Sequence, residues 1–328
     1  MARAWHLKSR PEGLPTAHNF ELKEIALPPV GEGMIRVRNQ WISVDPYMRG
    51  RMNDVKSYVP PFRLGEPMEG GAVGEVIESK AAGFAPGDIV LHMGGWRDEA
   101  VVPAQAARKL PDLGAPAQQF LGVLGTTGAT AYFGLLDAAS AKDGDTVFVS
   151  AAAGAVGSVV VQIAKLKGMT AIGSAGGAEK CAYVRSLGAD SVIDYRAGGL
   201  VKALAAAAPE GIDVYFDNVG GSHLDAALAL ARNQARFAIC GMIEGYNRLD
   251  PATLHYLPRI TVARIRLKGF LVFYYSLRMD EFYRDMGAWV KSGLVKSRET
   301  VAEGLEQAPD AFLGLFKGAN VGKMLVHI

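Results

Sequence analysis

The most informative stretch of this chain is Thr146-Val-Phe-Val-Ser-Ala-Ala-Ala-Gly-Ala-Val-Gly-Ser-Val-Val-Val-Gln-Ile-Ala-Lys165. Its first residues are β-branched or aromatic, which favours a strand, and an amphipathic segment over residues 158–167 follows a turn that contains Gly154 and Gly157. Glycines in such a turn let the backbone approach a pyrophosphate, and the next helix begins with unpaired N–H groups. Ala151 stands where many such turns have their first glycine. The order of strand, glycine turn and helix predicts the first unit of a dinucleotide-binding fold.

The second predicted strand, over residues 169–173, indicates which dinucleotide is bound. Folds that bind NAD usually place a carboxylate at the end of this strand, where it holds the ribose 2′-hydroxyl. Here the tip reads Gly173-Ser-Ala-Gly176, without an acidic residue, and Lys180 follows. A 2′-phosphate is a dianion that needs donors and positive charge. The sequence therefore predicts NADP(H) bound through Lys180, although Lys180 as a solvated helix residue is the alternative.

Further units of strand and helix follow at regular spacing. Strands are predicted at residues 191–194, 212–217, 235–239 and 266–272, and helices near 179–187, 200–207 and 222–230. This alternation is typical of an α/β protein with a doubly wound parallel sheet, a Rossmann fold. Ligands of such sheets bind outside the carboxyl ends of the strands. Asn218, Gly241 and Tyr246 lie just past predicted strand ends, so we expect them near the ligand.

The composition excludes several classes of protein. The net charge of the 328 residues is only +2, and no basic run is interleaved with aromatic residues, which argues against nucleic acid as a partner. No apolar stretch is long enough to span a membrane, and no signal peptide is evident. Two cysteines do not make a disulfide framework, so we expect a protein of the reducing cytoplasm.

The first part of the chain has a different character from the nucleotide-binding part. Strand-like pieces at residues 34–39, 72–79, 88–91 and 96–102 alternate with Gly and Pro turns, which predicts a β-rich, partly open barrel. A last strand is expected at residues 322–328. We therefore expect a substrate domain over 1–125, a nucleotide domain over 126–292, and a segment over 293–328 that returns to the first domain.

Several segments, spread over nearly the whole chain, resemble one known family. They are residues 43–52, 57–62, 65–70, 124–134, 151–157, 217–221, 240–247 and 320–323. The chain resembles the medium-chain dehydrogenase/reductase superfamily, in its zinc-free branch of leukotriene/prostaglandin reductases and plant double-bond reductases, and looks especially like the bacterial NADPH-dependent curcumin reductases. The resemblance implies a GroES-like β-rich barrel domain beside the Rossmann domain.

The resemblance also implies which residues meet the cofactor. The turn residues would contact the pyrophosphate, Lys180 the 2′-phosphate, and Ser174 and Tyr195 the adenosine end. Other positions would line the nicotinamide side, and Asn320 would reach the cofactor from the C-terminal segment. One departure is Glu244, which stands where this branch often has Ser. The full set implied for the cofactor is Gly154, Ala155, Val156, Gly157, Ser174, Lys180, Tyr195, Asn218, Cys240, Gly241, Met242, Ile243, Tyr246, Phe270, Leu271, Val272 and Asn320.

A metal site is not expected. Relatives that use zinc bind it with a Cys, a His-Glu pair and a further Cys or His, whereas this chain has Glu66-Pro67 in place of the pair and Val44-Asp45-Pro46 in the first ligand loop. Two cysteines cannot form a four-cysteine zinc lobe, and the six histidines show no ligand spacing.

Without a metal, the cofactor has to supply the chemistry. Hydride adds readily to an alkene conjugated to a carbonyl, and the resulting enolate needs a donor at oxygen and a proton at the α-carbon. By resemblance, Tyr246 is the first candidate for this catalysis, with a core tyrosine as the alternative. Tyr58, before Pro60-Pro61, is a second candidate that could equally pack on the prolines.

The expected function is therefore NADPH-dependent reduction of the double bond of small hydrophobic enones and enals. Two alternatives stay open: an NADPH:quinone oxidoreductase of the zeta-crystallin type, and a non-catalytic NADPH-binding protein. The aromatic residues Phe270, Phe273, Tyr274 and Tyr275 could wall a substrate pocket or form a subunit contact. Because the last sheet strand of this superfamily commonly pairs across a dimer axis, we expect a homodimer.

Overall fold

The structure, a computed structural model, describes residues 1–250 and 252–328 and divides into two units. Unit 1 contains Met1–Leu121, Glu299–Asn320 and Met324–Ile328, and unit 2 contains Gly122–Arg298 and Val321–Lys323. The chain therefore leaves unit 1 for a long continuous stretch and later contributes three more residues to unit 2.

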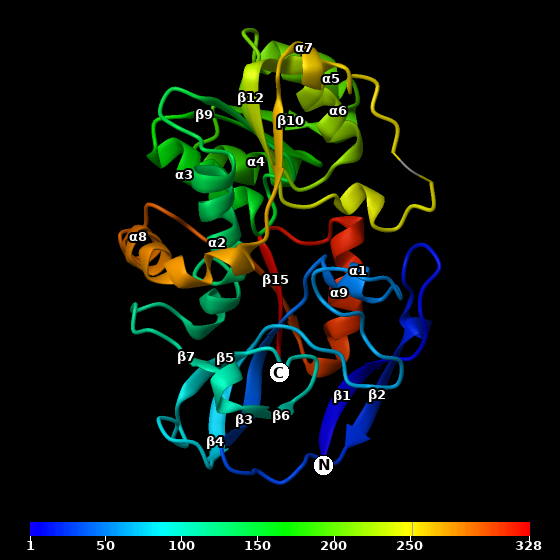
Figure 1. Cartoon of the computed structure of the whole chain (residues 1–328), viewed down its shortest axis with the longest axis vertical. Helices are drawn as coiled ribbons and strands as arrows, with labels where there is room; N and C mark the ends of the chain where they lie inside the picture. The colour runs from blue at the N-terminus through cyan, green and yellow to red at the C-terminus, as the bar shows by residue number, and fades with distance from the viewer. Residues whose placement is uncertain (251) are drawn as a thin grey trace. The chain divides into compact units, whose positions relative to one another are not determined.

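A six-stranded parallel sheet forms the centre of unit 2 (Figure 1). Its strand order is β10-β9-β8-β11-β12-β13. Successive strands are therefore added on one side of β8 up to β10, and on its other side from β11 onward. This is the order of a doubly wound fold, in which ligands bind where the order reverses. The strands are β8 (Thr146–Val149), β9 (Thr170–Ala175), β10 (Ser191–Asp194), β11 (Ile212–Asp217), β12 (Ala231–Ile239) and β13 (Arg266–Gly269).

Helices cover both faces of this sheet. Helix α2 packs with α3 on one face and α5 with α6 on the other, as Figure 1 shows. Buried side chains such as Phe148, Ile172 and Tyr215, none of them exposed, fill the layer on which α5 and α6 pack. The helices are α2 (Thr126–Phe133), α3 (Gly157–Leu166), α4 (Ala178–Ser186), α5 (Leu200–Ala207), α6 (Gly221–Leu230), α7 (Arg259–Val262) and α8 (Met279–Lys291). The predicted doubly wound sheet is confirmed.

The last strand of the sheet is shorter than the sequence predicts. A strand was expected over residues 266–272, but β13 ends at Gly269 and a 3-10 helix, Val272–Arg278, begins soon after. The aromatic ring of Tyr275 draws this segment away from the sheet, because it stacks on Phe133 at 4.5 Å and its hydroxyl donates to Asp137 at 2.8 Å. Side-chain packing here overrides the β propensity of the segment.

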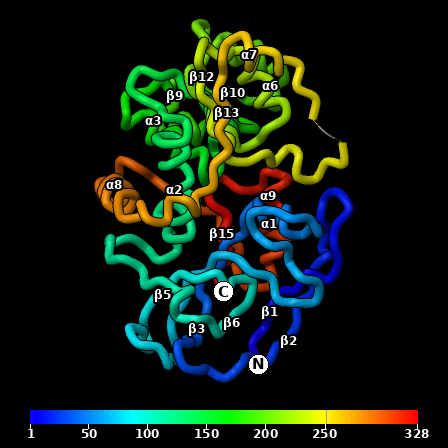
Figure 2. Tube along the Cα trace, in the orientation of Figure 1, coloured from blue at the N-terminus to red at the C-terminus, as the bar shows by residue number. Residues whose placement is uncertain are grey.

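Unit 1 is built around two sheets whose strands are mostly antiparallel, and their trace can be followed in Figure 2. In the larger sheet the long strand β3 pairs with β4 along one side, and with both β6 and β15 along the other. The strand expected near the C-terminal residues is therefore present. The elements are β1 (Ala2–Leu7), β2 (Phe20–Ile25), β3 (Met34–Ser43), α1 (Met48–Arg51), β4 (Ala72–Ser79), β5 (Ile89–His92), β6 (Glu99–Pro103), β7 (Arg108–Lys109), β14 (Glu299–Glu303), α9 (Ala308–Lys317) and β15 (Lys323–His327).

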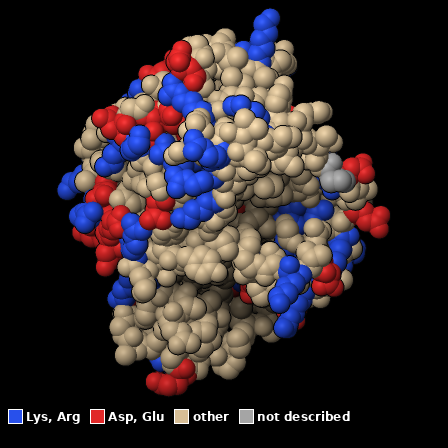
Figure 3. Space-filling model, turned by 45° about the horizontal axis from the view of Figure 1, so that its top comes forward, with Lys and Arg blue, Asp and Glu red and all other residues tan. Residues whose placement is uncertain are grey.

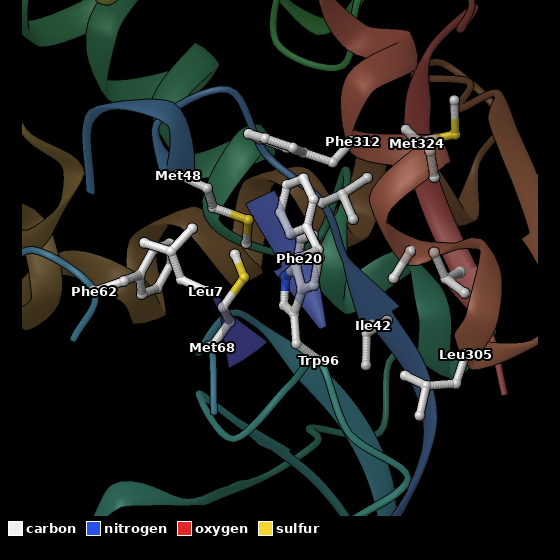
Figure 4. Packing of buried hydrophobic residues seen from close by; sticks show 14 of the residues in the cluster. Leu7, Phe20, Ile42, Met48, Phe62, Met68, Trp96, Leu305, Phe312 and Met324 are labelled. Carbon is white, nitrogen blue, oxygen red and sulfur yellow. The ribbon is translucent and has the colours of Figure 1, made fainter. Parts of the chain in front are cut away.

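The core of unit 1 centres on Trp96, which is fully buried (Figure 4). Its ring stacks on Phe20 at 5.9 Å and meets the edge of Phe312 at 6.0 Å. Burial of a side chain such as Phe312 contributes about 1.5–3 kcal/mol. The backbone of Trp96 has a φ of 59°, so the strand predicted over residues 96–102 begins only at Glu99. Because the Trp96 ring enters the core, the first three residues of the predicted strand do not join β6.

Charges of both signs are mixed on the surface. On the face shown in Figure 3, Lys and Arg side chains lie among Asp and Glu side chains. Within residues 1–250 and 252–328, no helix is long and apolar enough to cross a membrane.

Candidate functional site

The turn between β8 and α3 has the conformation that phosphate binding requires. Ala151 takes a φ of 48°, so an alanine adopts the left-handed conformation that glycine usually provides. Its carbonyl accepts the N–H of Gly154 at 2.9 Å, and a Cβ on Gly157 would clash with the same carbonyl. No side chain caps the start of α3. The helix N–H groups therefore have no competing side-chain acceptor at the turn.

A later segment of unit 2 forms one edge of this turn. Gly322 donates its N–H to the carbonyl of Ala153 at 2.7 Å and forms a parallel bridge with Gly154. Gly322 has a φ of 72°, and a Cβ there would clash with the carbonyl of Arg298. Only glycine fits this close approach. Asn320, the last residue of the preceding stretch of unit 1, is followed directly in the chain by Val321 of this segment.

Positive charge gathers at the tip of β9, around Gly176. A Cβ on Gly176 would lie 2.8 Å from both the Tyr195 hydroxyl and the Arg196 Nε, so these side chains lie directly over the glycine. The side chain of Lys180 is close enough for Arg196 to lower its pKa, although burial is the larger cause. An anion bound here would relieve the repulsion between the two cations. The tip therefore suits a phosphate group.

One carboxylate approaches this tip, but it is held by the backbone. Asp194 accepts the N–H groups of Gly177 and Arg196, both at 3.0 Å. These hydrogen bonds lower the pKa of its carboxyl. Asp194 therefore shapes the loop that presents Tyr195 and Arg196, and it does not extend from the end of β9 as the acid of an NAD site does.

The side chain of Ser174 is not accessible to a ligand in this structure. The side chain is fully buried, and its hydroxyl forms a hydrogen bond of 2.9 Å with Nε2 of His223. The His223 ring stacks on Phe148 and meets the edge of the Tyr195 ring at 5.2 Å. Burial lowers the pKa of His223 to about 4, so the imidazole is neutral at pH 7. Ser174 thus supports Tyr195 through His223, and a direct contact with a cofactor would need His223 to move.

Hydrogen bonds join the carboxyl ends of β8 and β11 around Asn218. The Asn218 amide nitrogen donates to the carbonyl of Ser150 at 2.7 Å, and the Asn218 N–H donates to the Ser150 hydroxyl at 2.9 Å. The buried carboxylate of Asp217 accepts the Tyr215 hydroxyl at 2.7 Å and the N–H of Gly220 at 2.7 Å. With its nitrogen engaged, the Asn218 amide retains its oxygen as an acceptor for a ligand.

The segment after β12 folds back on the same strand ends. Cys240 and Gly241 donate their N–H groups to the Asp217 carbonyl at 2.9 and 3.0 Å. Burial and the nearby Asp217 carboxylate raise the pKa of the Cys240 thiol to about 12. The Tyr246 hydroxyl accepts the N–H of Met242 at 3.3 Å, which places the phenol over its own loop. Residues 240–246 and Asn218 therefore form one group at the carboxyl ends of β11 and β12.

The three residues after β13 differ in how they can meet a ligand. The ring of Phe270 packs on Phe216 at 6.1 Å, and a Cβ on Gly134 would clash with it. The Phe270 side chain thus belongs to the packing between β11 and the π-helical turn Gly134–Ala138. Leu271 and Val272 are partly exposed and remain candidates for contact.

Unit 1 contributes a separate pair of tyrosines. Tyr58 is 54% exposed, whereas burial, followed by the nearby Asp45, raises the pKa of Tyr47 well above its usual value. Tyr58 lies near enough to Tyr47 to add to this shift, and the charges of Arg51 and Glu69 act on Tyr47 as well. Tyr58 is therefore an exposed tyrosine near a partly buried one whose hydroxyl stays protonated at neutral pH.

The structure thus groups most of the residues that the sequence singles out in unit 2. The β8–α3 turn, the tip of β9 and the group around Asn218 all lie at the carboxyl ends of the parallel strands. Sequence reasoning missed Arg196, His223 and Ser150. Only Arg196 had a signal, since it directly follows Tyr195; the other two are revealed by hydrogen bonds between distant residues.

Within the part of the chain that the structure describes, no group of three or more His, Cys, Asp or Glu residues could hold a metal ion. The two cysteines, Cys181 and Cys240, are both free thiols.

Comparison with known proteins agrees with this architecture. Residues 3–110 match the family described as the N-terminal domain of oxidoreductase, and residues 155–290 match the family described as zinc-binding dehydrogenase. An NADPH-dependent curcumin reductase of Escherichia coli is 44% identical, covering 99% of this chain and 96% of the relative. A 2-alkenal reductase (NADP(+)-dependent) of Nicotiana tabacum is 41% identical, covering 98% and 96%.

Among solved structures, the CurA protein of Vibrio vulnificus in complex with NADPH is similar, with a TM-score of 0.94 and 43% identity. The match covers 99% of this chain and 98% of that one. Because identity above 40% extends over nearly the whole length of such relatives, the chain belongs to the medium-chain dehydrogenase/reductase family.

Proposed function

We propose that the protein uses NADPH to reduce the carbon–carbon double bond of α,β-unsaturated ketones and aldehydes. The observation that carries this proposal is the Tyr246 hydroxyl, held on the Met242 N–H at the carboxyl ends of β11 and β12. The names of the similar curcumin and 2-alkenal reductases support the substrate class and the cofactor.

The residues present fit the cofactor. The glycine turn after β8 and the uncapped start of α3 suit the pyrophosphate, and Lys180, Arg196 and Tyr195 suit the 2′-phosphate. The nicotinamide half would adjoin Asn218, residues 240–243, Leu271 and Val272, and Asn320 would reach the cofactor from the C-terminal segment. When bound, NADPH supplies a hydride to the β-carbon of the substrate.

The protein's own task is to stabilise the charge that develops on the carbonyl oxygen. A phenol that donates a hydrogen bond to this oxygen lowers the energy of the enolate more than that of the substrate. Tyr246 is suited to this role, either directly or through a ribose hydroxyl. The α-carbon then takes a proton from Tyr246, Tyr58, a ribose hydroxyl or water.

The experiment follows isotopes from each source into the product. With NADPH carrying deuterium at C4 of the nicotinamide, we expect deuterium at the β-carbon of an enone, and solvent deuterium at the α-carbon. Deuterium at the carbonyl carbon, giving an allylic alcohol, would contradict the proposal. Turnover of quinones but not enones would favour quinone reduction, and tight NADPH binding without turnover of enals, enones or quinones would favour a non-catalytic role.

A homodimer is part of the proposal. Among the described residues, β13 pairs only with β12, so its other edge is unpaired. The adjoining segment exposes large apolar side chains, with Tyr274 at 84% and Leu277 at 98%. An unpaired strand beside exposed apolar residues suits a second copy of the same chain. The two free thiols fit a reducing compartment such as the cytoplasm.

A further inference from the structure

The loop that contains Tyr246 is closed by its own hydrogen bonds. Gly245 donates to the Met242 carbonyl at 2.9 Å, and Arg248 donates to the Gly245 carbonyl at 3.2 Å. A short 3-10 helix, Ile243–Gly245, lies between these contacts. We call residues 240–248 the tyrosine loop. Its internal bonds fix its shape, but they do not fix its position on the sheet.

Glu244 joins the tyrosine loop to helix α6. One oxygen of its carboxylate accepts the Ser222 hydroxyl at 2.9 Å and the Ser222 N–H at 3.2 Å, and the other accepts Arg248 Nη1 at 3.2 Å. Helix α6 has no cap from its own N-terminal residue, Gly220. A carboxylate at the start of a helix is favourable because it meets the unpaired N–H groups and the positive end of the helix dipole.

The backbone leaves room for this contact at two glycines. Gly221 has a φ of 47°, and a Cβ there would clash with the Glu244 carboxylate. Gly220 has a φ of 71°, and a Cβ there would lie 2.9 Å from Cβ of Met242. The main chain adds two further bonds, from Ile243 to the Asn218 carbonyl and from Glu244 to the Val219 carbonyl. The tyrosine loop therefore lies directly on the turn that contains Asn218.

We propose that Glu244 is a positioning residue that fastens the tyrosine loop to α6 and so holds Tyr246 in place before the cofactor binds. This inference rests on the proposed function, because Tyr246 is its proposed catalytic group. A loop that is already ordered does not lose conformational freedom when a ligand arrives, so the ligand binds more tightly. A shorter side chain with a single oxygen, such as that of serine, could not hold Ser222 and Arg248 at the same time.

The first test is made on the apoprotein. Glu244→Ala is expected to increase hydrogen exchange of the amides in the tyrosine loop, and Ser222→Ala is expected to do the same. Glu244→Gln, which keeps the length and one acceptor, should restore part of the protection. The matched control is Glu210→Ala, which removes an exposed glutamate whose side chain lies outside the site. Unchanged exchange in the loop of both Glu244→Ala and Ser222→Ala would overturn the proposal.

The second test asks whether the effect passes through Tyr246. Loss of a charged hydrogen bond that orders the loop should weaken NADPH binding by ~10-fold in Glu244→Ala, measured by fluorescence titration. The kcat for an enone should fall in Glu244→Ala, but not fall further when Glu244→Ala is added to Tyr246→Phe. Equal losses of kcat in both backgrounds would overturn the positioning role.

The role of Glu244 can be tested independently of the proposed enone reduction. Hydrogen exchange and NADPH titration need no substrate, so they decide the role of Glu244 in loop order even if no enone is reduced. A general fall in melting temperature with exchange spread over all of α6 and its neighbours would show that Glu244 only caps the helix, and would also overturn the proposal.

Discussion

Lys180 and Arg196 meet at the tip of β9, and together they are expected to select NADPH over NADH. Loss of one charge-assisted contact with a phosphate costs about 1.5–3 kcal/mol, so Lys180→Ala and Arg196→Ala should each raise the dissociation constant for NADPH roughly tenfold to a hundredfold. NADH, which has no 2′-phosphate, should bind almost as before. Fluorescence titration of both cofactors checks this, with Lys202→Ala, an exposed lysine of α5, as the control. Equal weakening of both cofactors would make the two residues structural.

Tyr246 is expected to matter more for turnover than for binding. In Tyr246→Phe the hydrogen bond to the developing enolate oxygen is lost, so kcat should fall ~10–1000-fold. The dissociation constant for NADPH should change much less, because the contact forms mainly in the transition state. Steady-state kinetics and titration measure the two effects, with Tyr256→Phe as the control. A near-normal kcat would move the role to Tyr58, a ribose hydroxyl or water.

At this scale the sequence identifies residues whose neighbours along the chain form a motif. Lys180 and Asn218 follow strand ends, so their positions at the site are predictable. Ser174 was expected just past its strand, which the sequence predicts to end at Gly173, but it lies within β9 and its hydroxyl points inward to His223, because a strand alternates its faces and one face is buried. Arg196 lies in the short 3-10 helix Tyr195–Ala197 that follows the neighbouring strand β10, and its approach to Gly176 depends on the twist and register of two strands.

Among the elements, the β8–α3 turn leaves no room for a side chain at Gly157. A Cβ on Gly157 would clash with the Ala151 carbonyl, so Gly157→Ala should shift the turn and weaken NADPH binding by at least tenfold, which corresponds to about 1.4 kcal/mol. The control is Gly50→Ala, a position where a Cβ meets nothing within 4 Å. Titration with NADPH and thermal unfolding measure the change. Unaltered affinity in Gly157→Ala would show that the turn can yield without loss of the site.

Element boundaries follow from the sequence where local propensity and packing agree. The β-branched run before Ser150 and the alanine-rich run over Leu200–Ala207 form the expected strand and helix. The run after Arg266 has the same β propensity, but the strand ends at Gly269, because Tyr275 stacks on Phe133 and donates a hydrogen bond to Asp137. The contact of Glu244 with α6 could not be predicted from the sequence either, because Glu244 and Ser222 come together only once β11 and β12 are paired.

For the whole molecule, the unpaired edge of β13 predicts that assembly depends on its exposed neighbours. The double variant Tyr274→Glu with Leu277→Glu would bring charges into an apolar interface, so it should sediment as a monomer while keeping its circular dichroism. Leu249→Glu, at a site that is 85% exposed in the same unit, is the control and should leave the assembly unchanged. A dimer that survives the double variant would place the interface elsewhere.

Metal content is a second property of the whole chain. Because the described residues contain no set of ligands for zinc, purified protein should hold no stoichiometric zinc and should keep its activity after treatment with a chelator. Elemental analysis and an activity assay before and after dialysis measure both quantities. Stoichiometric zinc together with loss of turnover on chelation would contradict this expectation.

The bridge between Gly154 and Gly322 also bears on how the protein is made. The ribosome synthesises all residues of the parallel sheet and of the β8–α3 turn before it adds Val321–Lys323. Until then the Ala153 carbonyl lacks the N–H of Gly322, and the turn has an open edge. We expect NADPH to stabilise completed chains but not nascent ones, because only a completed chain has the full turn. The supply of NADPH in the cell would then affect the lifetime of the protein, but not its folding during translation.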